Sequence, residues 1–85
     1  MKVYIFYRAN TESDIAVDNF LRLFHDRQAA QIRRVDVDTR DGDDLSRLYS
    51  IMSYPTVVVT TDDGQQIRLW HGSLPLVGEV TLYLN

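Results

Sequence analysis

The stretch Ser53-Tyr54-Pro55-Thr56-Val57-Val58-Val59 places a proline immediately before a run of β-branched residues. Proline has no N–H to donate to a sheet ladder, so within sheets it occurs at edges, at bulges or at the first position of a strand. Pro55 therefore predicts the start of a strand, and it sets how the chain enters that strand. Whether its peptide bond is cis, and what that geometry serves, are the next questions.

Length and composition predict one ordinary globular domain spanning residues 1–85. The chain has 85 residues, of which 45% are hydrophobic and 25% are charged. A chain of this size buries roughly 60% of its surface on folding, which is enough for a single core. No linker, repeat or low-complexity segment divides it.

The charge balance and the apolar runs limit the classes of partner. Ten Asp and two Glu outweigh eight Arg and one Lys, giving a net charge of −3 without a basic stripe, so we expect no nucleic-acid partner. The apolar run between Lys2 and Arg8 is too short for a signal sequence, and no run of about 18 apolar residues occurs. We expect a cytoplasmic protein with no membrane partner.

The first half of the chain predicts a strand, a helix and a second strand. Residues 3–7 are β-branched or aromatic and suit a strand covered on both faces. Residues 13–27 predict one helix, and residues 32–37 alternate apolar and charged side chains as an edge strand does. The helix is indicated by apolar residues at mainly helical spacing: Ile15, Val17, Phe20, Leu21 and Phe24.

The second half predicts a short helix, a hairpin and a terminal helix. The short helix follows Thr39, and its apolar face is expected to comprise Leu45, Leu48, Tyr49 and Met52. Residues 57–60 and 66–70 predict antiparallel strands, because Asp63-Gly64 between them favours a hairpin turn. From Leu74 onward a helix is indicated by Leu76, Val77, Val80, Tyr83 and Leu84.

The element order is therefore βαβαββα, which places the chain in the α/β class. A right-handed crossover makes the first two strands parallel neighbours, and the hairpin extends the other side of the first strand. We predict a four-stranded mixed sheet of order 2-1-3-4 with helices on both faces.

Three motifs accompany this order: Val35-Asp36-Val37-Asp38, the stretch from Tyr49 to Thr56, and Asp63-Gly64 followed by Gly72. Together with the element order, they resemble the thioredoxin superfamily in its short, glutaredoxin-length form. In that family a Tyr-x-Ile/Val-x-Ser-x-Pro-Thr stretch carries a cis-proline at the start of the third strand. The resemblance implies that Pro55 is cis and that the backbone N–H and C=O of Tyr54 point outward, where an extended peptide could pair with them.

The cysteines of that family are absent. Thioredoxins and glutaredoxins carry Cys-x-x-Cys where the first strand meets the first helix, and Thr11-Glu12-Ser13-Asp14 aligns with that place here. A hydroxyl cannot form or exchange a disulfide, and the chain contains no cysteine. We therefore expect no thiol–disulfide oxidoreductase activity, no enzyme of that class and no cofactor.

What the resemblance still implies is a binding groove beside the proline. It would run between residues 9–14, Tyr54-Pro55 and residues 70–73, and its candidate ligand-binding residues are Tyr7, Thr11, Ser13, Tyr54, Pro55, Trp70 and Ser73. For Thr11 and Ser13 we expect helix capping as the ordinary role. Tyr7 and Ser73 also resemble residues that hold the thiol and a carboxylate of glutathione in the related domain of glutathione transferases, although a core or groove-lining position is the better interpretation of Tyr7.

The sequence offers no pattern for a metal site. Acidic residues are dense between Asp36 and Asp44, but the fifth and twelfth positions of an EF-hand loop starting at Asp36 would be Arg40 and Arg47. A solvated strand end and an acidic helix start explain the acids better. His25 and His71 lie far apart in sequence, with no partner at ligand spacing.

Three functional hypotheses remain. The leading one is a redox-inactive domain that binds an extended peptide or a loop of a protein partner at the proline groove. The alternative is a domain that binds glutathione or a related thiol without disulfide exchange. The third is an oligomerising module that uses the apolar tail from Val80 to Leu84.

Overall fold

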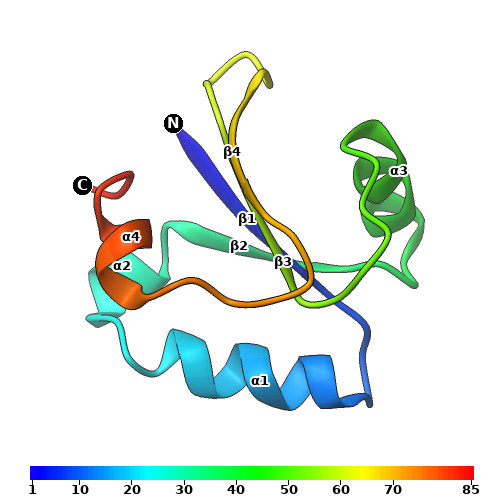
Figure 1. The fold of residues 1–85 in the computed structure, drawn as a ribbon, viewed down its shortest axis with the longest axis horizontal. Helices are drawn as coiled ribbons and strands as arrows, with labels where there is room; N and C mark the ends of the chain where they lie inside the picture. The colour runs from blue at the N-terminus through cyan, green and yellow to red at the C-terminus, as the bar shows by residue number, and fades with distance from the viewer.

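The computed structural model describes all 85 residues and shows a four-stranded mixed sheet with helices on both faces (Figure 1). The strands are β1 (Lys2–Tyr7), β2 (Ile32–Asp36), β3 (Thr56–Thr60) and β4 (Gln66–Trp70). The helices are α1 (Glu12–Leu21), α2 (Asp26–Ala29), α3 (Arg40–Leu48) and α4 (Val77–Thr81).

The sheet order is β2-β1-β3-β4, as the sequence predicts. β1 pairs in parallel with β2 and antiparallel with β3, and β3 pairs antiparallel with β4. Gly64 has a φ of 97° in the turn that joins β3 to β4, which is a conformation that glycine adopts at little cost. The edge position predicted for β2 is also confirmed.

Each face of the sheet carries its own apolar cluster, and alternate side chains of β1 and β3 contribute to each. The first cluster lies under α1 and α4, and the second lies between the sheet and α3. The first cluster comprises Val3, Ile5, Val17, Phe20, Phe24, Ile32, Val57, Val59 and Val80. The second cluster comprises Tyr4, Phe6, Val35, Val37, Ile51 and Val58.

The single helix predicted over residues 13–27 is wrong, because the chain forms two helices there. After Leu21 the backbone tightens, so that the N–H of Phe24 bonds to the C=O of Leu21, and His25 is extended with a ψ of 150°. This turn keeps Phe24 buried, with its ring 5.1 Å from that of Phe20. Buried aromatic packing therefore outweighs continuation of the helix.

The buried face of α3 also differs from the predicted one. Leu45 and Tyr49 do pack on the second cluster, but Leu48 and Met52 are 68% and 81% exposed. The buried face instead follows i, i+3, i+4, i+7 from Gly42 through Leu45 and Ser46 to Tyr49. Apolar periodicity missed this face because two of its four members are not apolar.

The tail forms a helix as predicted, but a short one. α4 has five residues, Val80 is fully buried, and Tyr83 and Leu84 pack against the first cluster beyond the helix end. Leu76 stays exposed. α2 and α4 lie at the same end of the sheet, remote from the start of α1 (Figure 1).

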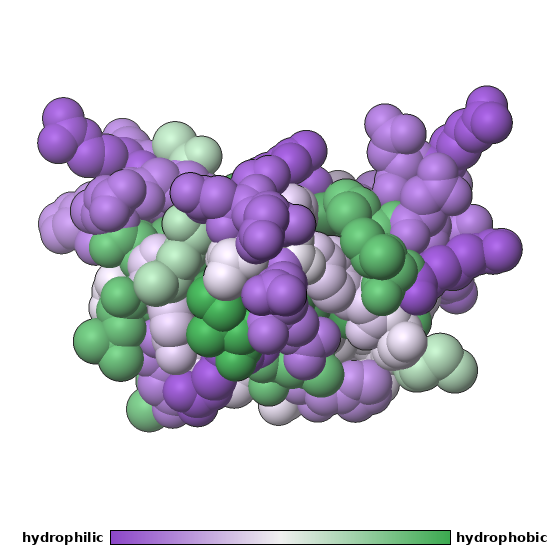
Figure 2. Space-filling model, turned by 90° about the horizontal axis from the view of Figure 1, so that it is seen from above, coloured by the Kyte–Doolittle hydropathy of each residue, from purple (hydrophilic) through white to green (hydrophobic).

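Figure 2 shows the molecule from above, turned by 90° from the view of Figure 1, and this face is mostly hydrophilic. Apolar side chains form separate small areas there, between protruding charged groups (Figure 2). No helix combines the length and the apolar content needed to cross a membrane.

Candidate functional site

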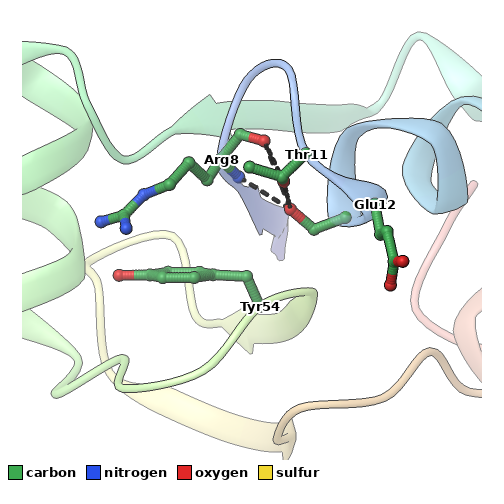
Figure 3. A pocket seen from close by; sticks show the side chains of 5 residues that line it. Arg8, Thr11, Glu12 and Tyr54 are labelled. Carbon is green, nitrogen blue, oxygen red and sulfur yellow. Dashed lines mark hydrogen bonds between the residues drawn. The ribbon is translucent and has the colours of Figure 1, made fainter.

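The junction of β1 and α1 carries an open hollow of about 370 Å³. It is lined by Arg8, Thr11, Glu12, Ser13 and Tyr54. The side chains of Arg8 and Tyr54 lie one above the other on one side, and Glu12 lies on the other (Figure 3). We call this the Tyr54 hollow.

The pairing of β1 with β3 explains why Arg8 and Tyr54 meet. The last paired residues are Phe6 and Thr56, so extending the register of the antiparallel ladder by two residues on each strand sets Arg8 opposite Tyr54. The guanidinium carbon of Arg8 lies 5.3 Å from the centroid of the Tyr54 ring, within the range of a cation–π contact. Arg8 also forms an ion pair of 3.4 Å with Asp38.

The bond between Tyr54 and Pro55 is cis, as the resemblance implies. Neither the N–H nor the C=O of Tyr54 has a hydrogen-bond partner within the chain. The neighbouring backbone is tied down, because Thr56 Oγ1 donates to the C=O of Ser53 at 2.7 Å and accepts from the N–H of Gly72 at 3.0 Å. The loop before β3 is thus anchored on both sides of an unpaired residue.

The predicted capping role of Thr11 and Ser13 is wrong. Thr11 is the N-cap residue of α1, but its side chain makes no cap bond to the helix and instead donates to the C=O of Arg8 at 2.6 Å. Ser13 Oγ accepts from the N–H of Arg8 at 3.0 Å and lies 2.6 Å from Thr11 Oγ1. Both hydroxyls therefore bond to the backbone of the β1–α1 turn, and Ser13 is buried there.

The structure brings together three of the seven predicted site residues, namely Thr11, Ser13 and Tyr54. Pro55 follows Tyr54 in the chain but does not line the hollow. Ser73 is exposed and lines no cavity.

Trp70 belongs to the α4 side of the molecule rather than to the hollow. Its ring packs on the first cluster 6.2 Å from the Tyr83 ring, and its indole N–H donates to Glu79 at 2.9 Å. Trp70 is thus partly core and does not line the hollow.

Tyr7 is the last residue of β1, an inner strand of the sheet, and it lines neither of the hollows that Tyr54 lines. The guanidinium of Arg34 covers its ring at 4.8 Å and also bridges to Asp14 and Asp18 of α1. Although partial burial opposes it, hydrogen bonding and attraction to Asp18 raise the pKa of Arg34 above its ordinary value. Tyr7 therefore packs beneath Arg34, the residue that joins β2 to α1 through its ion pairs.

Arg8 and Glu12 line the hollow although sequence reasoning did not select them. The register of β1 and β3 would have indicated Arg8, since it places residue 8 opposite residue 54. Glu12 carries no comparable signal, because an acid in the first turn of a helix is ordinary.

A second hollow of about 360 Å³ lies on the α3 side of Tyr54. Tyr54 lines both hollows, and the exposed side chain of Met52 forms part of the wall of the second. The complete lining is Asp43, Ser46, Arg47, Ser50, Ile51, Met52 and Tyr54.

The acidic residues after β2 serve local structure. Asp41 and Asp43 lie in the first turn of α3, where the helix dipole favours negative charge, and Thr39 caps this helix by accepting from the N–H of Gly42. No group of three or more acidic or histidine side chains is arranged to hold a metal ion.

Comparison with known proteins shows likeness of fold only. No family model matches the sequence, and no curated protein matches it significantly. Eight solved chains do match in structure. One of them, described as the structure of a malarial protein, superposes with a TM-score of 0.58 at 17% sequence identity, over 80% of this chain and 75% of that chain.

Proposed function

We propose that this chain is a thioredoxin-like domain without thiol chemistry, which binds an extended peptide segment of a protein partner at Tyr54. The β2-β1-β3-β4 sheet and the cis Tyr54–Pro55 bond support the thioredoxin-like assignment. Since the chain has no cysteine, disulfide exchange is not part of the proposal.

The observation that carries the proposal is the unpaired backbone of Tyr54. Its N–H and C=O both lack partners within the chain, on a residue that stands just before β3. A residue of an extended peptide can satisfy both groups at once, as in a hydrogen-bonded pair of an antiparallel ladder. The two hollows that Tyr54 lines leave room for the neighbouring peptide side chains.

The glutathione alternative has less support. The two residues that would hold the thiol and the carboxylate are not gathered at the hollow, because Tyr7 lies beneath Arg34 and Ser73 lines no cavity. Calorimetry with millimolar glutathione tests this alternative directly, and we expect no heat of binding.

The peptide proposal is tested by selecting binders from a displayed library of random peptides and scanning the best one with N-methyl residues. Main-chain pairing predicts that N-methylation at one position weakens binding on the order of tenfold or more, while methylation of the adjacent residues, whose N–H groups point away, has a much smaller effect. A flat response along the whole peptide would contradict pairing at Tyr54.

The hollow itself is tested by substitution. Arg8→Ala removes a wall of the hollow and exposes the Tyr54 ring, so we expect it to weaken the selected peptide. Arg27→Ala removes an exposed arginine of α2 at the far end of α1 and serves as the matched control. Equal affinities of the two variants would place the peptide elsewhere.

A further inference from the structure

Ser53 and His71 form a side-chain pair that the proposed function does not use. Ser53 Oγ lies 2.7 Å from His71 Nε2, although the two residues are 18 positions apart in the sequence. Ser53 is in the loop before β3, and His71 follows β4 directly. A hydroxyl within hydrogen-bond distance of an imidazole nitrogen is the arrangement in which histidine can take the proton of a serine nucleophile.

The backbone holds both members of this pair in place. Thr56 Oγ1 bonds to the C=O of Ser53 and to the N–H of Gly72, the residue after His71. Gly72 has a φ of 75° and lies beside Ser53, since a Cβ at position 72 would be in ordinary van der Waals contact, at 3.5 Å, with Ser53 Cβ and Oγ. The contact therefore joins two chain segments whose backbones are both bonded to Thr56.

The pair is open to solvent and has a hydrogen-bond donor next to it. Ser53 is half-buried and His71 is exposed, so a small molecule can reach Oγ. The residue after Ser53 is Tyr54, whose N–H has no partner within the chain. The N–H of the residue following a nucleophilic serine is a common donor to the oxyanion of acyl transfer.

We propose that Ser53 and His71 are a catalytic pair that hydrolyses activated esters through an acyl-serine intermediate. Ser53 Oγ attacks the acyl carbon while its proton passes to His71 Nε2, and the Tyr54 N–H hydrogen-bonds the oxyanion. The bond from the acyl carbon to the alcohol oxygen then breaks, and that oxygen receives the proton from His71. Water attacks the acyl-serine with His71 again taking a proton, which returns to Ser53 Oγ as the carboxylic acid leaves.

The substrate class follows from what the pair lacks. No side chain hydrogen-bonds to Nδ1 of His71, so nothing orients the imidazole as the carboxylate of a serine–histidine–aspartate triad does. Loss of that carboxylate costs triads about 10⁴ in kcat. We therefore assign esters with good leaving groups, such as aryl acetates, and not amides or peptides. This proposal does not depend on peptide binding at Tyr54.

The test combines p-nitrophenyl acetate hydrolysis with covalent labelling by a fluorophosphonate, mapped to residues by mass spectrometry. We expect label on Ser53, and we expect Ser53→Ala to lower the hydrolysis rate on the order of tenfold or more. His71→Gln should lower both the rate and the labelling of Ser53. Mapping the modified residues distinguishes reaction at Ser53 from reaction at the amino terminus and Lys2, which aryl acetates also acylate.

His25→Gln is the matched control, because an exposed imidazole can hydrolyse aryl acetates by itself. His25 is exposed at the start of α2 and its side chain makes no cap bond, so this variant should keep the wild-type rate. Circular dichroism checks the fold of each variant, and Ser53→Thr, which keeps a hydroxyl, should retain part of the label if Ser53→Ala loses structure.

Two results would overturn the proposal. One is hydrolysis by Ser53→Ala at the wild-type rate, which would mean that imidazole acts on the ester directly. The other is equal labelling of Ser53 in wild type and in His71→Gln, which would remove His71 as the base.

Discussion

Gly42 lies where α3 comes closest to the end of β2. A Cβ at this position would stand 1.8 Å from the carbonyl oxygen of Asp36 and 2.8 Å from Thr39 Oγ1. The nearest atom is backbone and cannot give way as a side chain would. Glycine is thus required at position 42, because without a side chain it lets α3 pack closely against the end of β2.

Gly42→Ala should therefore destabilise the protein strongly. Because the helix must move away from β2, we expect a loss on the order of 2–3 kcal/mol in the free energy of unfolding, measured by urea denaturation. Gly78→Ala is the matched control, since nothing lies within 4 Å of a Cβ there. Alanine at 78 should leave stability unchanged or raise it by up to about 1 kcal/mol. Similar losses from both substitutions would contradict this explanation.

Thr56 holds the loop that carries Tyr54. Its side chain is fully buried and its hydroxyl serves two backbone groups, at Ser53 and at Gly72. Thr56→Val keeps the shape but leaves both groups unpaired, so we expect a loss of about 1–3 kcal/mol by urea denaturation. Thr81→Val, which removes an exposed hydroxyl bond to Gly78, should cost far less. A loss at 81 as large as that at 56 would contradict the anchoring role.

At the scale of elements, the end of α3 is connected to the β3–β4 turn through Tyr49. Its hydroxyl donates to the C=O of Gly64 at 2.9 Å, and its ring packs on the second cluster. Burial and the neighbouring Tyr4 raise the pKa of Tyr49 above its ordinary value. The folded state thus favours the protonated phenol.

This shift predicts a loss of stability in alkali. A pKa raised by folding contributes stability that is complete below the unfolded value, about 10 for tyrosine, and is lost as pH rises through the folded value. Urea midpoints between pH 8 and pH 11 should fall more steeply for the wild type than for Tyr49→Phe, which cannot ionise. Parallel curves for the wild type and Tyr49→Phe would contradict a specific effect at Tyr49.

The elements also show how far sequence reasoning reaches. The sheet order followed from the right-handed crossover between the first two strands and from the Asp63-Gly64 turn, because both connect elements that are consecutive in the chain. The break after Leu21 and the buried face of α3 did not, since they depend on where Phe24 packs and on how closely Gly42 approaches Asp36.

The candidate site could be predicted only in part for the same reason. Tyr54 and Pro55 form a contiguous motif that can be read directly. The contacts of Arg8 with Tyr54 and of Ser53 with His71 join distant residues, and only the strand register and the folded loops bring them together.

At the scale of the whole molecule, one sheet contributes side chains to both apolar clusters. A destabilising substitution on either face should therefore destabilise the two clusters together. Val58 and Val59 are adjacent and fully buried, yet they belong to opposite clusters. Val58→Ala and Val59→Ala should each cost on the order of 2 kcal/mol, whereas Leu82→Ala at an exposed position should cost little. In every variant the fluorescence of Trp70 and far-ultraviolet circular dichroism should report one coincident transition. Separate transitions would show that the faces unfold independently.

The proposed function is tested most directly by mapping ¹⁵N–¹H amide shifts while the selected peptide is titrated into the labelled protein. Pairing at Tyr54 predicts that the Tyr54 amide shifts most, as its free N–H acquires a partner, with smaller changes at Arg8, Glu12 and Met52 around the two hollows. Changes confined to the outer edge of β4 or to the tail around α4, with the Tyr54 amide unmoved, would contradict it.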